Sequence, residues 1–405
     1  MKRYFPIVTL IAILALLTTF IACSEFAESV DPIIDQVPDE TLNAESQVNF
    51  LITGVQIRFS SAAAQVLVLS SGLSDEFIFD SNVPNATFPT FLDIDRGVIT
   101  LDNNSVDGAY NPLGELRYFA DDLIRRVNAI TVSNTTLKTR ALYTGYLYGG
   151  VARYLYATYF GLNPTEGGGI IDNGPFIPSN SMYDLALEKL NLALANVPAA
   201  IDGKVANSLI ARIHLLRANY AAARTAAQAG MVAGDAALQG RYSTEQTNFY
   251  WQQAGLGRPQ FVCDPRFAAY VVAEPTEKSR ISLTPITGRN SVVYQRQSKY
   301  GTDSTPIDFM NWQENALMLA ELDIRLDNNA ASALTRVNAV RTSRGVKTLT
   351  AIDLDGIYVE RDKELFVTGI RLADQRRFGR FHLPAGSWQF LPITDDERNN
   401  NPNLK

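Results

Sequence analysis

Carboxylates that could support acid–base chemistry occur in small groups along the chain. They are found at Asp121-Asp122, within residues 395–397, and at Glu360 and Glu364. A glycosidase holds two carboxylates on either side of a cleft, and one of the pair has a raised pKa. Glu360 and Glu364 are four residues apart, so they share one helix face, and basic residues flank them. We therefore predict structural ion pairs there, because an ion pair lowers a carboxylate pKa, the wrong direction for a general acid.

Residues for nucleophilic, metal or phosphate chemistry are scarce. The chain has two histidines, His214 and His382, and two cysteines, Cys23 and Cys263. His214 lies within an alanine-rich helical pattern and His382 follows several arginines, so we predict structural roles for both. Three consecutive glycines at 167–169 lack the Lys-Ser/Thr of a phosphate-binding loop. We predict that the protein is not an enzyme and holds no metal and no cofactor.

Aromatic residues are the candidates for ligand binding: Phe249, Tyr250 and Trp251, with Tyr300 as a further candidate. Sugar rings present C–H faces that stack on exposed aromatic rings, and the amide side chains beside Trp251 can bond sugar hydroxyls. Three consecutive aromatics cannot share one helix face, so we expect at least one to be exposed. The alternative is that these rings anchor their segment to the body of the protein.

Composition limits the class of protein. The chain has 405 residues, of which 46 % are hydrophobic and 19 % charged, as in a globular protein. With 36 Lys and Arg against 42 Asp and Glu, the net charge is -6. Because there is no basic excess to neutralise phosphates, we predict no nucleic-acid partner.

The N-terminus has the pattern of an export signal: a basic start, an apolar run over residues 4–20, and then Ala22-Cys23. A small residue before a cysteine at this point resembles the bacterial lipoprotein signal, in which the cysteine becomes the lipidated first residue. The sequence predicts a signal peptide over 1–22, lipidation at Cys23 and a tether over 23–40. A plain secretory signal and a retained membrane helix are the alternatives.

Helical periodicity dominates the remaining chain. The predicted helices are 44–70, 113–132, 135–160, 179–197, 205–216, 220–231, 315–326 and 330–341. Gly145, Gly149 and Gly150 inside one of them suggest that a neighbouring helix approaches closely. The last four form two hairpins rich in small residues, separated by an aromatic-rich insertion at about 239–308. This pattern predicts an all-α, tetratricopeptide-like helical repeat scaffold with loop-rich insertions.

Several segments, in one order, resemble the SusD/RagB family of Bacteroidota nutrient-uptake lipoproteins. They are Arg140-Ala141-Leu142, Tyr159 to Pro164, Met182-Tyr183-Asp184, residues 206–220, residues 317–341, Glu360 to Arg377, and Leu391-Pro392-Ile393-Thr394 with the residues that follow. Together they span nearly all of the chain after the predicted signal.

The resemblance implies a SusD-like domain over 41–405 and a role in nutrient uptake. It implies a lipid-anchored protein of the outer membrane that faces the cell exterior, binds an oligosaccharide or peptide, and passes it to a SusC-like TonB-dependent transporter. The repeats would dock on the transporter, and the loop-built face, where Trp251 lies, would hold the nutrient. The alternative function is a tetratricopeptide-type adaptor that binds proteins or peptides on a concave helical surface.

Overall fold

A computed structural model describes residues 38–404. The chain divides into two units, residues 1–47 and 48–405. The described part of the first unit contains two short 3-10 helices, η1 (Asp39–Leu42) and η2 (Glu45–Gln47). The predicted signal peptide (1–22), Cys23 and most of the predicted tether lie outside the described residues.

The second unit begins with α2 (Val48–Leu73), an apolar helix that packs against α4 and α5. The stretch Glu45–Leu73 is the one candidate membrane span within residues 38–404, judged by length and composition. However, 56 % of its most apolar window is buried inside the protein. Val55, Phe59 and Leu67 are each about 1 % exposed, so α2 serves as a core helix.

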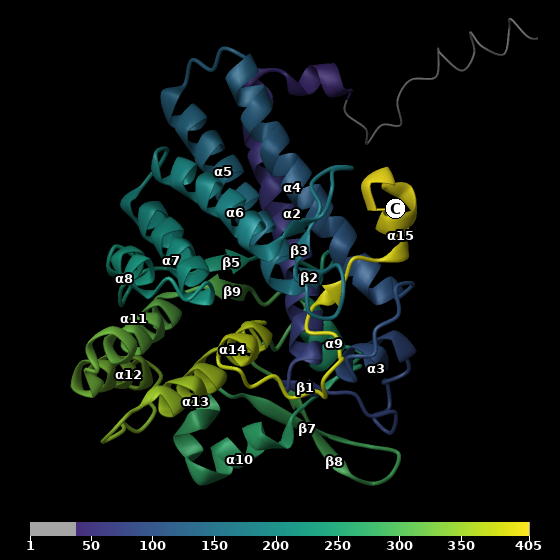
Figure 1. Cartoon of the computed structure of the whole chain (residues 1–405), viewed down its shortest axis with the longest axis vertical. Coiled ribbons are helices and arrows are strands. Elements are labelled where there is room, and N and C mark those ends of the chain that lie inside the picture. The colour runs from purple at the N-terminus through teal and green to yellow at the C-terminus, as the bar shows by residue number, and fades with distance from the viewer. Residues whose placement is uncertain (1–37, 405) are drawn as a thin grey trace, which may run out of the picture. The chain divides into compact units, whose positions relative to one another are not determined.

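A row of helices follows in which each packs on its neighbour. They are α4 (Asn104–Ala129), α5 (Thr135–Tyr159), α6 (Ser179–Leu194), α7 (Ala200–Leu216), α8 (Tyr220–Gln228), α11 (Trp312–Asp327), α12 (Ala330–Ser343) and α13 (Leu354–Glu364). Contacts join successive helices from α4 to α8, then join α8 to α11, and α11 to both α12 and α13 (Figure 1). The predicted all-α, tetratricopeptide-like scaffold is therefore confirmed.

The glycines of α5 do allow close helix contacts. A Cβ on Gly145 would lie 2.6 Å from Ile124 Cγ1 of α4, and one on Gly150 would lie 2.8 Å from Leu190 Cγ of α6. Both distances are shorter than van der Waals contact, so these two positions need glycine. Gly149 is less crowded, with its nearest neighbour at 3.5 Å.

The start of α4 differs from the sequence prediction. The helix begins at Asn104 and continues through Pro112, whereas the sequence predicted a start at 113. The Asn103 side chain caps it by accepting the backbone N–H groups of Ser105 and Val106 at 3.1 and 3.2 Å. Capping and the burial of the first turns therefore outweigh the hydrogen bond that Pro112 cannot make.

The insertion between the two hairpins starts and ends at one place. Strand β5 (Leu238–Gly240) pairs antiparallel with β9 (Ile307–Met310), which brings the ends together. Between them lie α9 (Phe249–Ala254), β6 (Val262–Cys263), α10 (Pro265–Ala273), η3 (Pro275–Ser279), β7 (Leu283–Thr287) and β8 (Val293–Gln297). Because β5 and β9 close the insertion, α8 and α11 pack directly on each other.

Short segments complete the unit. They are β1 (Phe77–Ile78), α3 (Pro89–Asp95), β2 (Phe160–Gly161), β3 (Gly168–Gly169), β4 (Ile177–Pro178), α14 (Arg371–Arg377), β10 (Leu391–Pro392), α15 (Asp395–Asn400) and η4 (Pro402–Leu404). Strand β10 runs parallel to β2, β3 pairs with β4, and β7 pairs with β8. On α14, Arg371 donates two hydrogen bonds to Asp75, at 2.6 and 2.8 Å, and so ties the C-terminal region to the end of α2.

Candidate functional site

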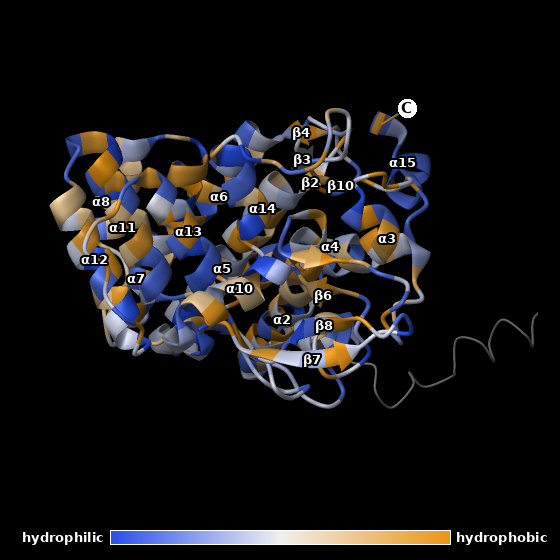
Figure 2. Cartoon of the chain, turned by 90° about the horizontal axis from the view of Figure 1, so that it is seen from below, coloured by the Kyte–Doolittle hydropathy of each residue, from blue (hydrophilic) through white to orange (hydrophobic). Residues whose placement is uncertain are grey.

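The loop that follows α2 is fastened to the insertion. Strand β1 pairs antiparallel with β6, and Figure 2 shows β6, β7 and β8 close together along one side. The buried Gln260 side chain accepts the backbone N–H groups of Thr87 and Phe88, both at 3.0 Å. Its amide also donates to the Asn85 carbonyl at 2.7 Å. One glutamine thus fixes the backbone of residues 85–88.

The β7–β8 hairpin holds the same loop from a second side. The Tyr294 hydroxyl donates to Asp80 Oδ2 at 2.5 Å and accepts from Asn290 Nδ2 at 3.0 Å. The bond from Tyr294 lowers the pKa of Asp80, which keeps this acceptor ionised. In addition, the Arg289 backbone N–H donates to the Asn82 carbonyl at 2.8 Å. The loop therefore has a defined position relative to the insertion.

These fastenings create a surface of aromatic and polar side chains. The Arg258 guanidinium lies 4.7 Å from the centroid of the half-buried Phe88 ring, and donates to Thr87 Oγ1 at 3.1 Å. Directly before it, Gly257 lies against the indole of Trp251, since a Cβ there would be 3.0 Å from Cζ3. We call Thr87, Phe88, Trp251 and Arg258 the aromatic surface. Its rings can stack on a sugar face while the guanidinium and hydroxyl bond its oxygens.

The structure places the four aromatic candidates differently. Phe249 and Trp251 are half-buried on α9. Tyr250 is 0 % and Tyr300 3 % exposed, and their rings stack at 5.6 Å. The Tyr250 hydroxyl bonds Ser71 Oγ at 2.8 Å, and burial raises the pKa of Tyr250 well above its ordinary value. Trp251 is thus the candidate on the aromatic surface, while Tyr250 and Tyr300 contribute to the core.

The amide side chains around α9 have separate roles. Asn248 caps the helix by accepting the Trp251 N–H at 3.1 Å, and it donates to the Thr305 carbonyl at 2.7 Å. Gln253 is 6 % exposed, whereas Gln252 is half-buried beside Trp251. Of the three amides, Gln252 is the one with room to bond a ligand.

Thr87, Phe88 and Arg258 were not among the predicted site residues. The signal that could have indicated them is the Gly255-Leu256-Gly257 segment, which begins four residues after Trp251. Glycines beside a candidate ring favour close approach of another segment. The segment that approaches is residues 87–88, and the Gln260 side chain holds it there. No local sequence pattern reveals this long-range contact.

The carboxylates of α13 form ion pairs. Glu360 accepts from Arg280 at 2.8 Å and from Arg341 at 2.6 Å. Glu364 accepts from Arg344 at 2.9 and 2.8 Å. Both glutamates are nearly fully buried. Both glutamates are therefore paired with arginines, in the structural role that the sequence predicted.

The histidines lie apart from one another. His214 is half-buried on α7, and burial lowers its pKa. His382 is exposed by its overall surface area, with Nδ1 at 3.3 Å from Gln375 Nε2. Partial desolvation by the surrounding protein still lowers its pKa. Within residues 38–404, no group of three His, Cys, Asp or Glu side chains is placed to hold a metal ion.

Solved structures with the same architecture decide the fold. A SusD superfamily protein from Bacteroides thetaiotaomicron VPI-5482 matches with a TM-score of 0.73 and 14 % identity, over 89 % of this chain and 99 % of that one. The chain has the SusD-like fold. A SusD-like carbohydrate binding protein from Bacteroides vulgatus ATCC 8482 (TM-score 0.67, 16 % identity) matches over 89 % of this chain and 97 % of its own. A laminarin binding SusD-like protein (TM-score 0.70, 13 % identity) matches over 88 % of this chain and 98 % of its own.

No family model matches the sequence, and no curated protein matches it. The resemblance to the SusD/RagB family is therefore confirmed by the structure, at the level of the fold. Within the SusD-like fold of this chain, the aromatic surface is built from the loop after α2 and the insertion. The row of repeat helices contributes none of its four residues.

Proposed function

We propose that this protein captures a glycan on the aromatic surface. The observation that carries the proposal is that Arg258 stacks on Phe88 while Gly257, the residue directly before Arg258, lies against Trp251. The stacked guanidinium keeps Phe88 in place. Rings of this kind bind sugar faces, and the polar groups beside them bind hydroxyls. No bond is made or broken in this function.

Two of the matching structures support a sugar as the ligand. One is described as a carbohydrate binding protein and another as laminarin binding. An oligosaccharide suits the aromatic surface better than a peptide, because the surface offers two aromatic rings for stacking, and a guanidinium and a hydroxyl that can bond sugar oxygens.

The proposal includes a place in the cell. The Ala22-Cys23 junction after an apolar run supports lipidation at Cys23 and attachment to the outer membrane, facing the exterior. The helical repeats are the part that we expect to contact a SusC-like TonB-dependent transporter, to which the glycan would be passed. The adaptor function is the competing proposal, and the identity of a co-purified partner separates the two.

Native gels containing laminarin, starch, xylan or pectin test the glycan-binding proposal. We expect at least one polysaccharide to slow the wild-type protein, and Trp251→Ala to weaken that interaction about tenfold. Arg258→Gln should weaken it as well. Tyr118→Ala is the matched control, because Tyr118 is 53 % exposed on α4, outside the aromatic surface.

Two outcomes would contradict the proposal. One is the absence of retardation by every polysaccharide. The other is equal retardation of the Trp251→Ala variant and the wild-type protein, with unchanged melting temperature for both. If Trp251→Ala loses both its fold and its binding, Trp251 belongs to the core. The binding of Arg258→Gln then decides whether the aromatic surface captures the glycan.

A further inference from the structure

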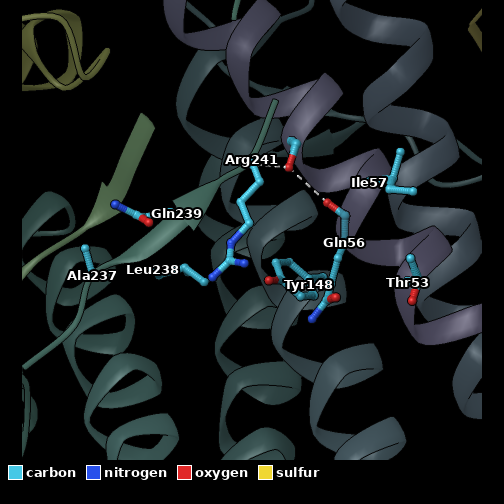
Figure 3. Close-up of a pocket in the computed structure, with 9 residues that line it drawn as sticks. Thr53, Gln56, Ile57, Tyr148, Ala237, Leu238, Gln239 and Arg241 are labelled. Atoms are coloured by element: carbon cyan, nitrogen blue, oxygen red, sulfur yellow. Dashed lines mark hydrogen bonds between the residues drawn. The ribbon is translucent and has the colours of Figure 1, made fainter. Parts of the chain in front are cut away.

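A pocket unrelated to the aromatic surface lies between α2, α5 and β5. Its volume is about 430 Å³, within the roughly 300–1,000 Å³ of small-ligand sites. Figure 3 shows Tyr148 of α5, Gln56 and Thr53 of α2, and Arg241, which follows β5, around this space. None of its lining residues belongs to the aromatic surface.

The backbone at Arg241 is fixed to α2. The Ser60 hydroxyl accepts the Arg241 backbone N–H at 2.9 Å and donates to the Gln56 carbonyl at 3.1 Å. The Tyr242 hydroxyl donates to the Ser60 carbonyl at 3.1 Å. The Arg241 side chain is exposed and makes no hydrogen bond or ion pair with any residue of the described chain.

Tyr148 forms the inner wall. It is 6 % exposed, and its ring packs 4.7 Å from the Phe59 ring in the core. Burial raises the pKa of Tyr148, and the nearby positive charge of Arg241 acts in the opposite direction. Its hydroxyl therefore stays protonated and can donate. Within residues 38–404 it makes no hydrogen bond to another residue, and because it is not one of the buried polar atoms without a partner, it is open to the pocket.

The charge in the pocket is uncompensated. No carboxylate is among its lining residues. Two acidic groups near these residues already have hydrogen-bond donors: Asp308 accepts from Gln239 Nε2 at 2.8 Å, and Asp202, whose charge acts on Tyr148, accepts the Ala199 N–H at 3.1 Å. The pocket therefore offers the cation of Arg241, the hydroxyl of Tyr148 and the amide of Gln56.

We propose that this pocket binds an acidic sugar of mono- or disaccharide size, with its carboxylate on Arg241 and its hydroxyls on Tyr148 and Gln56. A guanidinium binds a carboxylate through paired N–H donors, and hydroxyl and amide groups match the rest of a sugar ring. The site is independent of the proposed glycan capture on the aromatic surface. It would give the protein a second, charge-selective contact with a glycan.

Calorimetric titration with D-glucuronate, D-galacturonate and N-acetylneuraminate tests the proposal, with D-glucose, D-galactose and acetate as neutral-sugar and carboxylate-only probes. We expect at least one acidic sugar to bind at least about tenfold more tightly than the neutral sugars and acetate. Arg241→Gln should remove that preference, and Tyr148→Phe should weaken binding of the preferred sugar. Lys278→Gln, an exposed charge on η3, is the matched control.

The proposal is overturned if no acidic sugar binds, if neutral sugars bind equally well, or if acetate alone accounts for the affinity. It is also overturned if Arg241→Gln binds as the wild type does. Trp251→Ala should leave this binding intact, so loss in Trp251→Ala but not in Arg241→Gln would move the ligand to the aromatic surface. Arg241 makes no side-chain contact that the fold needs, so its variant should stay folded.

Discussion

Glu76 lies at the junction between α2 and the loop that carries part of the aromatic surface. It is 1 % exposed, and its Oε1 accepts the Val367 backbone N–H at 2.8 Å. Burial raises the pKa of this carboxyl to about 7 from its ordinary 4.5, against the opposing hydrogen bonds from Ser71 and Val367. At the residue scale, this group makes stability depend on pH.

We predict that Glu76→Gln changes the pH dependence of unfolding. Between 4.5 and about 7 the folded chain keeps the Glu76 proton while the unfolded chain releases it, so the free energy of unfolding falls as pH rises. The contribution is fully present below 4.5 and amounts to about 3 kcal/mol. Urea unfolding of both proteins from about pH 4 to about pH 8 measures it. Parallel stability curves would contradict this assignment.

The residues of the candidate site show what a sequence can reveal. Trp251 stands out locally, because three consecutive aromatics cannot all be buried by one short helix. The burial of Tyr250 and Tyr300 follows from their mutual stacking and from Ser71, which is far away in the sequence. Phe88 is placed at the site by tertiary contacts, among them the hydrogen bond from its backbone N–H to Gln260. Such contacts have no periodicity that a pattern could detect.

At the element scale, the repeat helices depend on small residues at their contacts. Ala211 on α7 and Ala320 on α11 are both 0 % exposed. We predict that Ala211→Trp and Ala320→Trp each lower the free energy of unfolding by about 1–3 kcal/mol or more, because a closely packed interface has no room for an indole. Thermal or chemical unfolding of each variant is the measurement.

Ala221→Trp is the control for that pair, because Ala221 is exposed on the neighbouring α8. It should leave the melting temperature nearly unchanged. If both buried variants melt with the wild type, the helices do not pack as the structure shows.

Helix periodicity predicted the repeat elements well, and the two hairpins α7–α8 and α11–α12 occur where the small residues indicated. The start of α4 was missed because Pro112 suggests a break, whereas the Asn103 cap and buried first turns extend the helix. The insertion likewise shows that local patterns do not reveal tertiary contacts. Its location was evident from composition, but its closure by β5 and β9 is a long-range pairing.

At the scale of the whole molecule, the proposed lipidation of Cys23 would decide where the protein acts. We predict that Cys23→Ala releases the chain from the outer-membrane fraction and abolishes its labelling by a fatty-acid analogue, because the proposal makes this thiol the point of lipid attachment. Cys263→Ala is the matched control, since Cys263 is buried in the fold at 3 % exposure. Retention of the Cys23 variant in the membrane with unchanged labelling would refute the anchor.

We further predict a stable complex with a TonB-dependent barrel. The protein, tagged at its C-terminus and extracted in mild detergent, should co-purify with the barrel at a constant ratio through size-exclusion chromatography. Recovery of soluble proteins alone would favour the adaptor function, in which the repeats bind peptides or proteins.

Glycan capture on the aromatic surface is the central claim, and tryptophan emission tests it most directly. The chain has three tryptophans, so Trp312→Phe with Trp388→Phe leaves Trp251 as the only indole emitter. Titration with the polysaccharide that retards the wild-type protein should shift or quench this emission, with a midpoint that matches the polysaccharide concentration giving half-maximal retardation. A glycan that binds with full affinity and leaves Trp251 emission unchanged would contradict the account.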